Sequence, residues 1–513
     1  MATRRTSTQI LLLSTLLLTK SNFLEAAESN TDSRNVVCIE RERKALLEFR
    51  KGLKDPSGWL SFGLERIVVT GPASTAAIQR ATSSSLTLKP LMFAVHSAKV
   101  KHLTTEHVLA VGLSSLLYLD LGAMNLSKAN NWFEAVNMLL SLTTLYLSSC
   151  ELNGLPESLT VPYPRFQIGS LYKLRTLDLS SNVINGEIKG LIDALGGCSN
   201  NTLADLDLSS NSLQGNLPDS LGKLKYLRCL RLAQNSFSGS LPWSIGNLSS
   251  LTILDLSFNS MNGTVLQNIG QLTSLSEITV RNCQLGPGFP TWLRTQVEAS
   301  QLTLSVAGIS DMIPVWFWNL TSSLWWVELD LSDNQFRGKL PGSVSFGYNI
   351  GAWVDLGFNR LEGTILRKLQ GLRKLVILDL SKNNLLGDVT SSLCELPSLI
   401  FLTLSCNNLS GELFLVLQNC SGDHPQMLGS FGSVYLSGSY SYVLPSTQHI
   451  RFLQHVEIVS KGNVIDLSSN DLKGEIPDHI TELSALVTLN LSWNHFSRKI
   501  PENIGNLQPV GES

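Results

Sequence analysis

The stretch His102–His107, HLTTEH, is the part of the sequence nearest to a catalytic motif. Zinc peptidases of the H-x-x-E-H type hold the metal with two histidines four residues apart and use the glutamate as general base. Here the histidines are five residues apart, so we expect no metal site. The sequence also lacks a G-x-S-x-G elbow, a phosphate-binding loop and a kinase signature. We therefore predict that the protein is not an enzyme and has no cofactor.

The cysteines do not form a metal-binding pattern either. No C-x-x-C pair occurs, which disfavours zinc, and the spacing is too wide for a dense disulfide framework. Cys38, Cys198 and Cys420 are expected to form structural pairs or to remain free rather than to act as nucleophiles. The eight cysteines lie at positions 38, 150, 198, 229, 283, 394, 406 and 420.

Composition and the N-terminus indicate an exported, folded protein. The chain has 513 residues, 39 basic and 41 acidic side chains and a net charge of −2, which gives no basic surface for nucleic acid. Residues 1–27 resemble a secretory signal, with Arg4 and Arg5 before the apolar run ILLLSTLLL. No later stretch is long and apolar enough to span a bilayer, so we expect a secreted chain.

A repeat of about 24 residues organises the chain. The frame LxxLxLxxN, in which we number the positions 1 to 9, occurs fourteen times. Four successive intervals of 24 residues separate the frames that end at 211 and 307. Position 9 falls at residues 124, 150, 182, 211, 235, 259, 283, 307, 334, 359, 383, 407, 470 and 494.

Each frame predicts a short strand with leucines on one face and polar residues on the other. One strand cannot bury its own leucines, so successive copies are expected to stack into a parallel sheet along a solenoid. The asparagine at position 9, the ladder position, can bond unpaired loop backbone. Cys150 and Cys283 occupy this position with a weaker hydrogen-bond donor, and Met124 and Ala307 have no side-chain donor there.

The segment after the ladder position predicts a second short strand and a helical turn. A glycine recurs there, which suggests positive φ or close backbone approach. The glycines at this position are 215, 239, 263, 338, 363, 387, 411 and 474. The fold expected is an α/β repeat solenoid with a parallel sheet on its concave face.

The full pattern, LxxLxLxxNxLxGxIP, is typical of plant extracellular leucine-rich repeats. ERKALLEFRKGLKDPSGWLS, RNCQLGPGFPTWLRTQ and GISDMIPVWFWNL resemble the receptor-like proteins of plant innate immunity, especially the receptors for fungal ethylene-inducing xylanase. The resemblance covers roughly residues 38–61 and 113–507. It implies a horseshoe ectodomain that detects a microbial or endogenous ligand. Members of that family lack a kinase, carry a C-terminal membrane helix and signal through partner receptor kinases.

The chain departs from the family pattern in three places. Residues 62–112 are atypical, residues 418–461 form an island-like insertion, and the sequence stops within a repeat without a C-terminal cap. Poorly covered solenoid ends predict fraying. The predicted organisation is a signal peptide (1–27), a partial cap (28–61), the atypical segment (62–112), repeats (113–417), the island (418–461), truncated repeats (462–507) and a tail (508–513).

Function is expected on the concave face, because the leucines build the body of the repeat. Aromatic residues and arginine dominate binding hot spots, and several stand where Ser, Thr or Asp is usual. Trp353 and Phe358 in particular could stack on a peptide or a sugar ring. The ligand-binding residues that we predict are Tyr118, Tyr146, Arg231, Glu277, Arg281, Trp353, Phe358, Phe401 and Trp493.

Two further polar features have competing interpretations. Position 5 is Asp in eight frames. These residues either form an acidic stripe for a basic peptide or are simply the residue type common at this position of the strand. In the island, Tyr435, Tyr440, Tyr442, His449 and His455 could make adaptable contacts or belong to a misassembled remnant. N-glycosylation acceptors occur at Asn125, Asn200, Asn247, Asn262, Asn319, Asn408, Asn419 and Asn490.

We therefore predict the ligand-recognition region of a kinase-lacking cell-surface immune receptor. Its partners would be a protein or peptide ligand and a co-receptor kinase. The family resemblance implies the plasma membrane, whereas the chain as written would be extracellular. The alternatives are a secreted inhibitor of a microbial cell-wall-degrading enzyme, as in polygalacturonase-inhibiting proteins, and a non-functional truncated receptor product.

Overall fold

The computed structural model describes the chain as two units. The first comprises residues 1–152 and 164–173, and the second residues 153–163 and 174–513. The residues described are 85–87, 116–127, 132–137, 139, 141–155, 173–197, 201–261, 265–321, 327–341, 352–365, 375–389, 396, 399–412, 463–478, 480, 486–497 and 499–506. The predicted signal peptide, cap and island, the HLTTEH stretch and Cys38, Cys198, Cys394 and Cys420 lie outside these residues.

Among its described residues, the first unit has three parallel strands and one helix. The strands are β1 (Ser85–Thr87), β2 (Tyr118–Asp120) and β3 (Thr144–Tyr146), and the helix is α5 (Trp132–Asn137). Strand β1 pairs with β2 through Leu86 and Leu119. The atypical segment thus contributes a strand that the sequence pattern did not predict, because SLTL is only a fragment of the nine-residue frame.

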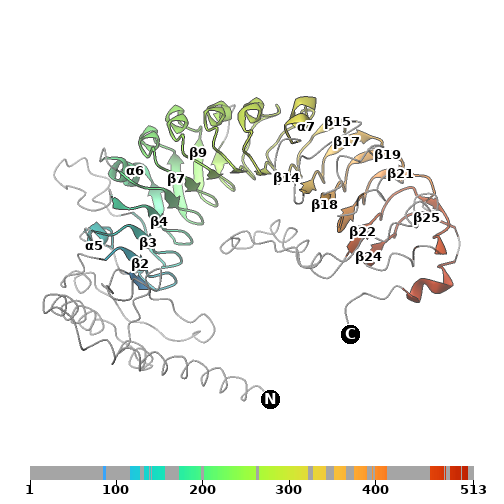
Figure 1. Ribbon diagram of the computed structural model, residues 1–513, viewed down its shortest axis with the longest axis horizontal. Coiled ribbons are helices and arrows are strands. Elements are labelled where there is room, and N and C mark those ends of the chain that lie inside the picture. The colour runs from blue at the N-terminus through green and yellow to red at the C-terminus, as the bar shows by residue number, and fades with distance from the viewer. Residues whose placement is uncertain are drawn as a thin grey trace, which may run out of the picture. The chain divides into compact units, whose positions relative to one another are not determined.

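In the second unit, twelve parallel strands form the principal sheet, one from each frame. Figure 1 shows these strands on the inner side of a curve, with the short helices on its outer side. The strands are β4 (Thr176–Asp178), β6 (Asp205–Asp207), β8 (Cys229–Arg231), β10 (Ile253–Asp255), β12 (Glu277–Thr279), β13 (Gln301–Thr303), β14 (Val327–Asp330), β16 (Ala352–Asp355), β18 (Leu375–Asp379), β20 (Phe401–Thr403), β22 (Asn463–Asp466) and β24 (Leu486–Asn490).

The register of the strands repeats the frame. Leu206, Leu230 and Leu254 pair in line at position 4, and each of these side chains is fully buried. Positions 3 and 5 of neighbouring strands are likewise paired and point to the concave face. The predicted leucine-rich-repeat solenoid is confirmed.

A fixed turn ends each strand. Where position 5 is Asp, its carboxylate accepts a hydrogen bond from the backbone N–H of position 7, as for Asp207 and Ser209 at 2.9 Å. The residue at position 8 then has positive φ in all fourteen frames, between 50° and 63°. Even Val306, which is β-branched, adopts this left-handed conformation, at φ 56°. The turn is therefore a property of the repeat and not of a glycine.

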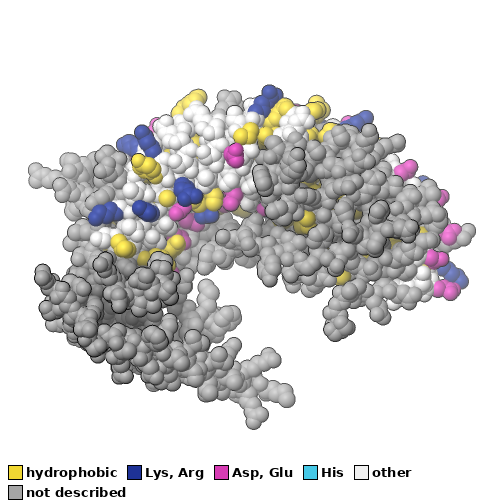
Figure 2. Space-filling view, in the orientation of Figure 1, with side chains coloured by type: hydrophobic (Ala, Val, Ile, Leu, Met, Phe, Trp, Pro, Cys, Tyr) yellow, Lys and Arg dark blue, Asp and Glu magenta, His cyan; other side chains and the backbone are white. Residues whose placement is uncertain are grey.

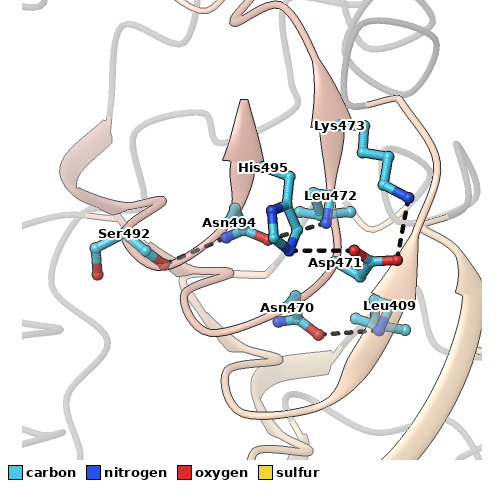
Figure 3. Close-up of polar contacts among 8 residues, drawn as sticks. All are labelled: Leu409, Asn470, Asp471, Leu472, Lys473, Ser492, Asn494 and His495. Carbon is cyan, nitrogen blue, oxygen red and sulfur yellow. Dashed lines mark hydrogen bonds and ion pairs between the residues drawn. The ribbon is translucent and has the colours of Figure 1, made fainter. Parts of the chain in front are cut away.

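The predicted asparagine ladder is present. The Asn359 side-chain amide donates to the carbonyls of Leu331, Leu356 and Gly357, and its Oδ1 accepts from the N–H of Phe336. Each such asparagine thus bonds its own repeat and the preceding one. Figure 3 shows the same acceptor role for two later asparagines, Asn470 with Leu409 N–H and Asn494 with Leu472 N–H.

Thiols replace part of the ladder. The Cys150 thiol donates to the Leu121 carbonyl and the Cys283 thiol to the Leu256 carbonyl, at 3.1 and 3.2 Å. Burial raises the pKa of the Cys283 thiol to about 11, so it stays protonated and can donate. At Ala307 no side-chain donor exists. There the next asparagine, Asn334, accepts from the N–H of Ala307 and also from that of Ile309.

Second strands and helical turns follow the ladder position, as predicted. In the described part of the second unit the helical elements are α6 (Lys189–Gly196), η6 (Asp219–Lys223), η7 (Trp243–Asn247), η8 (Val265–Gln271), η9 (Thr291–Thr295), α7 (Val315–Thr321) and η13 (Glu502–Asn506). The second strands form three small sheets, which we call the lateral sheets. They comprise β5 (Asn185–Glu187), β7 (Ser212–Asn216), β9 (Ser236–Gly239) and β11 (Ser260–Met261); β15 (Arg337–Lys339), β17 (Arg360–Gly363), β19 (Asn384–Asp388) and β21 (Asn408–Ser410); and β23 (Lys473–Gly474) with β25 (His495–Phe496).

The recurring glycine allows neighbouring lateral strands to lie close together. Gly363 has φ 88°, and a Cβ there would lie 2.9 Å from the Lys339 side chain. The predicted positive φ is found at seven of the eight glycines, and Gly263 lies outside the described residues.

The lateral sheets are interrupted between β11 and β15. In this interval Phe289, Trp316, Phe317 and Phe336 form an aromatic cluster, with Phe289 in contact with the other three rings at centroid distances of 5.2 to 6.0 Å. The Arg294 guanidinium lies 4.7 Å from the Trp316 ring. In these repeats lateral pairing with β15 is reduced to an isolated bridge between Met312 and Arg337, and the aromatic cluster packs nearby.

Candidate functional site

The concave face of the second unit has two parts that differ in chemistry. From β6 to β14, position 3 carries Asp205, Cys229, Ile253, Glu277, Gln301 and Glu328 in register; from β16 to β22 it carries Trp353, Ile377, Phe401 and Val464. We call these the polar part and the apolar part after the residue type that predominates at position 3, although Cys229 and Ile253 belong to the first. The side chains come into line because the strands pair without a shift, except for an irregularity between Ala352 and Trp353.

Arg231 is the centre of the polar part. It occupies position 5 on β8, where its paired neighbours on β6 and β10 are Asp207 and Asp255. Burial raises the pKa of the Asp207 carboxyl above its ordinary value, and hydrogen bonds from Ser209 and the Arg231 charge oppose that shift. In the described part of Figure 2, basic and acidic side chains are likewise interspersed on the visible face. The predicted ligand residue Arg231 thus lies among carboxylates on a half-buried surface.

Three carboxylates lie in line farther along the sheet. Asp330, Asp355 and Asp379 are paired on β14, β16 and β18. Burial and the charges of Asp379 and Asp330 hold the pKa of Asp355 well above its ordinary value. Asp355 also lacks a hydroxyl partner at position 7, because that residue is Gly357, whereas Ser332 donates its hydroxyl to Asp330 at 2.6 Å.

The eight aspartates share one structural role. This favours the interpretation that Asp is simply common at this position of the strand over that of a dedicated acidic stripe. Every one accepts a hydrogen bond from the backbone N–H two residues later, at 2.8 to 3.0 Å. The bond closes the turn that follows each strand, so the aspartate would recur whether or not a ligand bound there. The aspartates are 120, 178, 207, 255, 330, 355, 379 and 466.

The apolar part is more buried than the sequence suggests. Ile377, Phe401 and Val464 pack together at 4%, 5% and 6% exposure, with Trp353 and Val376 half-buried against them. Phe401, which we predicted as a ligand-binding residue, is therefore buried, because its neighbours on β18 and β22 carry aliphatic side chains that pack against its ring. Trp353 keeps a half-exposed position next to this cluster.

Position 8 adds cation–aromatic contacts at the end of the strands. The Lys382 ammonium lies 4.1 Å from the Phe358 ring, and the Arg281 guanidinium lies 5.8 Å from the Phe258 ring. Phe358 is half-exposed, and Trp493 is 84% exposed. Phe358 follows strand β16 with φ 56° and so does not share a strand face with Trp353.

The first unit has its own aromatic pair. Tyr118 on β2 and Tyr146 on β3 are half-buried, and their ring centroids lie 5.8 Å apart. The nine predicted ligand residues are thus divided between the units, and we treat the two tyrosines separately from the seven residues of the second unit.

Sequence reasoning missed several members of these groups. Ile377, Val464, Lys382 and Phe258 all contact a predicted site residue. Comparison of position 3 or position 8 from one frame to the next would have found them. A search for unusual residues within one strand finds single side chains. These groups extend across several strands, so such a search misses most of their members.

The structure places five of the predicted glycosylation acceptors. Asn125, Asn247, Asn319 and Asn408 are exposed, while Asn490 is half-buried on β24. Its Oδ1 accepts from the N–H and the hydroxyl of Ser492. Asn200, Asn262 and Asn419 lie outside the described residues.

Metal-ligating side chains do not converge in the described part of the chain. Among these residues, no group of three or more His, Cys, Asp or Glu side chains has the geometry to hold a metal ion. Within the same residues, no helix combines the length and the apolar character needed to cross a bilayer.

Comparison with known families identifies the repeat. The leucine-rich-repeat family model matches residues 141–161, 202–224, 226–248, 326–346, 374–396 and 485–507, and a second leucine-rich-repeat model matches residues 173–188. The chain is similar to Receptor-like protein EIX1 of Solanum lycopersicum, at 36% identity over 90 residues, and to Receptor-like protein EIX2 of the same plant, at 39% over 88 residues. Each match covers 17% of this chain and 8% of the relative.

Solved structures agree with the fold. The ectodomain of the Arabidopsis thaliana receptor kinase GASSHO1/SCHENGEN3, in complex with CASPARIAN STRIP INTEGRITY FACTOR 2, is 27% identical with a TM-score of 0.53. The match covers 77% of this chain and 43% of the GASSHO1/SCHENGEN3 chain. The PEPR1–AtPEP1 structure is 27% identical with a TM-score of 0.56. The match covers 77% of this chain and 54% of the PEPR1–AtPEP1 chain. The chain thus carries leucine-rich repeats and is similar, over part of its length, to the plant receptor-like proteins EIX1 and EIX2.

Proposed function

We propose that the concave face of the second unit binds a peptide or protein ligand at the cell surface, and that the protein signals through a partner receptor kinase. The observation that carries the proposal is that Arg231, Trp353 and Phe358 remain half-exposed on or beside the concave face of this sheet. A surface of this kind offers charged and aromatic contacts to one extended chain. Aromatic and arginine side chains are the residues that contribute most to protein recognition.

The relatives support this choice of ligand class. Both solved structures named above share the leucine-rich-repeat fold, and the first is in complex with its factor. By analogy, an extended ligand would lie across the strands of the second unit and contact positions 3, 5 and 8. Lack of a kinase and a role in immunity belong to the proposal on the strength of the similarity to EIX1 and EIX2 alone.

A selection experiment tests the proposal while the ligand is still unidentified. A displayed library of random peptides is selected on the secreted protein and then screened against the Trp353→Ala/Phe358→Ala variant. Peptides that bind the native protein and lose at least tenfold affinity for the variant are expected. Peptides that bind both proteins equally, or no binders at all from a folded protein, would contradict it. Arg231→Ala gives an independent test of the polar part.

Purified ethylene-inducing xylanase serves as a second probe, because the chain resembles proteins of the EIX type. Binding that is lost in the Trp353→Ala/Phe358→Ala variant would extend the proposal to a protein ligand. The matched control is Ser469→Ala, which changes position 8 in a later repeat without removing an aromatic ring.

A further inference from the structure

Two exposed apolar side chains lie beside glycosylation acceptors in folded parts of the second unit. Leu386 on β19 is 49% exposed and is paired in register with Asn408 on β21, which is also exposed. Val315 at the start of α7 is 68% exposed, and Asn319 lies one helical turn later. Single exposed apolar residues are ordinary, so the arrangement matters here and not the exposure itself.

The geometry places each asparagine next to its apolar neighbour. Adjacent parallel strands are about 4.8 Å apart and paired residues point to the same side, so Leu386 and Asn408 stand together on the lateral sheet. In a helix, residues four apart have their Cβ atoms about 5–6 Å apart, which puts Val315 and Asn319 on one face of α7. In both cases the first sugar of an N-linked glycan would lie within reach of the apolar side chain.

Both acceptors have the required sequence. Asn408-Leu409-Ser410 and Asn319-Leu320-Thr321 match the N-x-S/T pattern. At the first, the middle residue Leu409 is fully buried, so the strand is anchored while Asn408 points outward. A pyranose ring has an apolar C–H face, and burying it against an aliphatic side chain removes apolar area from water.

We infer that Asn408 and Asn319 carry N-linked glycans whose first N-acetylglucosamine packs over Leu386 and Val315. The glycans therefore act as covers for apolar side chains on the lateral and outer surfaces, apart from the concave face. The inference rests on the passage through the secretory pathway that the proposed function requires. Asn490 differs, because its neighbour in register is Asp466, which needs no such cover.

The first test measures occupancy. The full chain is secreted behind a heterologous signal from cells that make high-mannose glycans, and peptides are analysed after enzymatic release of the glycans in ¹⁸O-labelled water. Labelled Asn408 and Asn319 are expected. Folded, secreted protein with both sites unlabelled would overturn the inference. No ligand is involved, so failure here leaves the concave-face proposal standing, and failure of ligand selection leaves this one standing.

The second test measures the cover itself. Trimming each glycan to its first N-acetylglucosamine should leave binding of a hydrophobic dye unchanged, whereas complete removal should raise it. Ser410→Ala, which abolishes the acceptor but keeps Asn408 and Leu386, should reproduce the rise, and adding Leu386→Thr should reverse it. A rise that persists in the Leu386→Thr background would overturn the packing. Ser492→Ala, at the Asn490 acceptor, is the control expected to show no change.

Discussion

The repeats at residues 327–411 and those at residues 277–321 solve the same stacking problem by different means. The former, the regular repeats, combine ladder asparagines with lateral strands β15, β17, β19 and β21. The latter, the interrupted repeats, have Cys283 and Ala307 at the ladder position and no lateral strand, and they contribute three of the four rings of the aromatic cluster. The principal sheet continues through both, with β12, β13 and β14 in register.

The comparison shows which parts of the repeat are exchangeable. The buried aliphatic residues at positions 4 and 6 and the left-handed residue at position 8 are kept in both regions. The asparagine and the second strand are replaced together in the interrupted repeats. We infer that hydrogen bonds along the ladder and apolar packing on the outer side can substitute for one another. Substitutions of Phe289, Asn359 and Arg294 test this, and one of Asp355 tests the electrostatics of the regular repeats.

Phe289→Ala should have the largest effect. Phe289 is 6% exposed and contacts three rings, and truncation of a buried Phe costs about 4 kcal/mol of unfolding free energy. The matched change is Leu241→Ala, in an earlier repeat that has a lateral strand. It should lower the free energy of unfolding by about 3 kcal/mol, because it removes no ring contacts. Urea unfolding followed by hydrogen exchange of the local amides measures both. Equal losses would show that the cluster is ordinary core.

Asn359→Ala should come second. It removes one acceptor and three donor contacts of a buried amide and leaves the Phe336 N–H without its bond. The free energy of unfolding should fall by about 3 kcal/mol. Cys283→Ala removes a single thiol bond and should cost about 1 kcal/mol. Faster exchange of the Phe336 amide is the specific readout. A similar loss in both variants would mean that the ladder is equally important in the two regions.

Asp355→Asn should change the pH dependence of stability. Because the folded protein raises the pKa of Asp355, it holds that proton more tightly than the unfolded chain does, and stability falls as pH rises above about 4. The variant should therefore be relatively more stable than the native protein at pH 7 than at pH 4. Asp466→Asn is the control, since Asp466 lies between Thr403 and Asn490. Parallel pH profiles for native and Asp355→Asn protein would refute the prediction.

Arg294→Ala should have the smallest effect. Its guanidinium covers the Trp316 ring at an exposed site, where such a contact is worth about 0.5–1 kcal/mol. Arg294→Lys should retain part of this contribution, and a thermal melt with tryptophan fluorescence follows both. A loss as large as that of Phe289→Ala would show that Arg294 holds the cluster together.

The repeat and its direction of stacking could be predicted from the sequence because the frame recurs at nearly constant spacing. The ladder and the lateral glycines followed from the types of residue that the turn demands, as Asn359 and Gly363 show. The burial of Phe401 could not be predicted, because it depends on which side chains neighbouring strands place beside it. Strand β1 was missed for a similar reason, since its pairing with β2 is not encoded in its own few residues.

The left-handed residue at position 8 has a consequence for how this surface can vary. All fourteen frames share the same backbone there, while the side chains range from Ala123 to Trp493 and none is buried. The shared turn thus accepts a wide range of side chains at that row. Mutation can rewrite the row repeat by repeat while the scaffold stays intact, so related gene copies should differ most along this row.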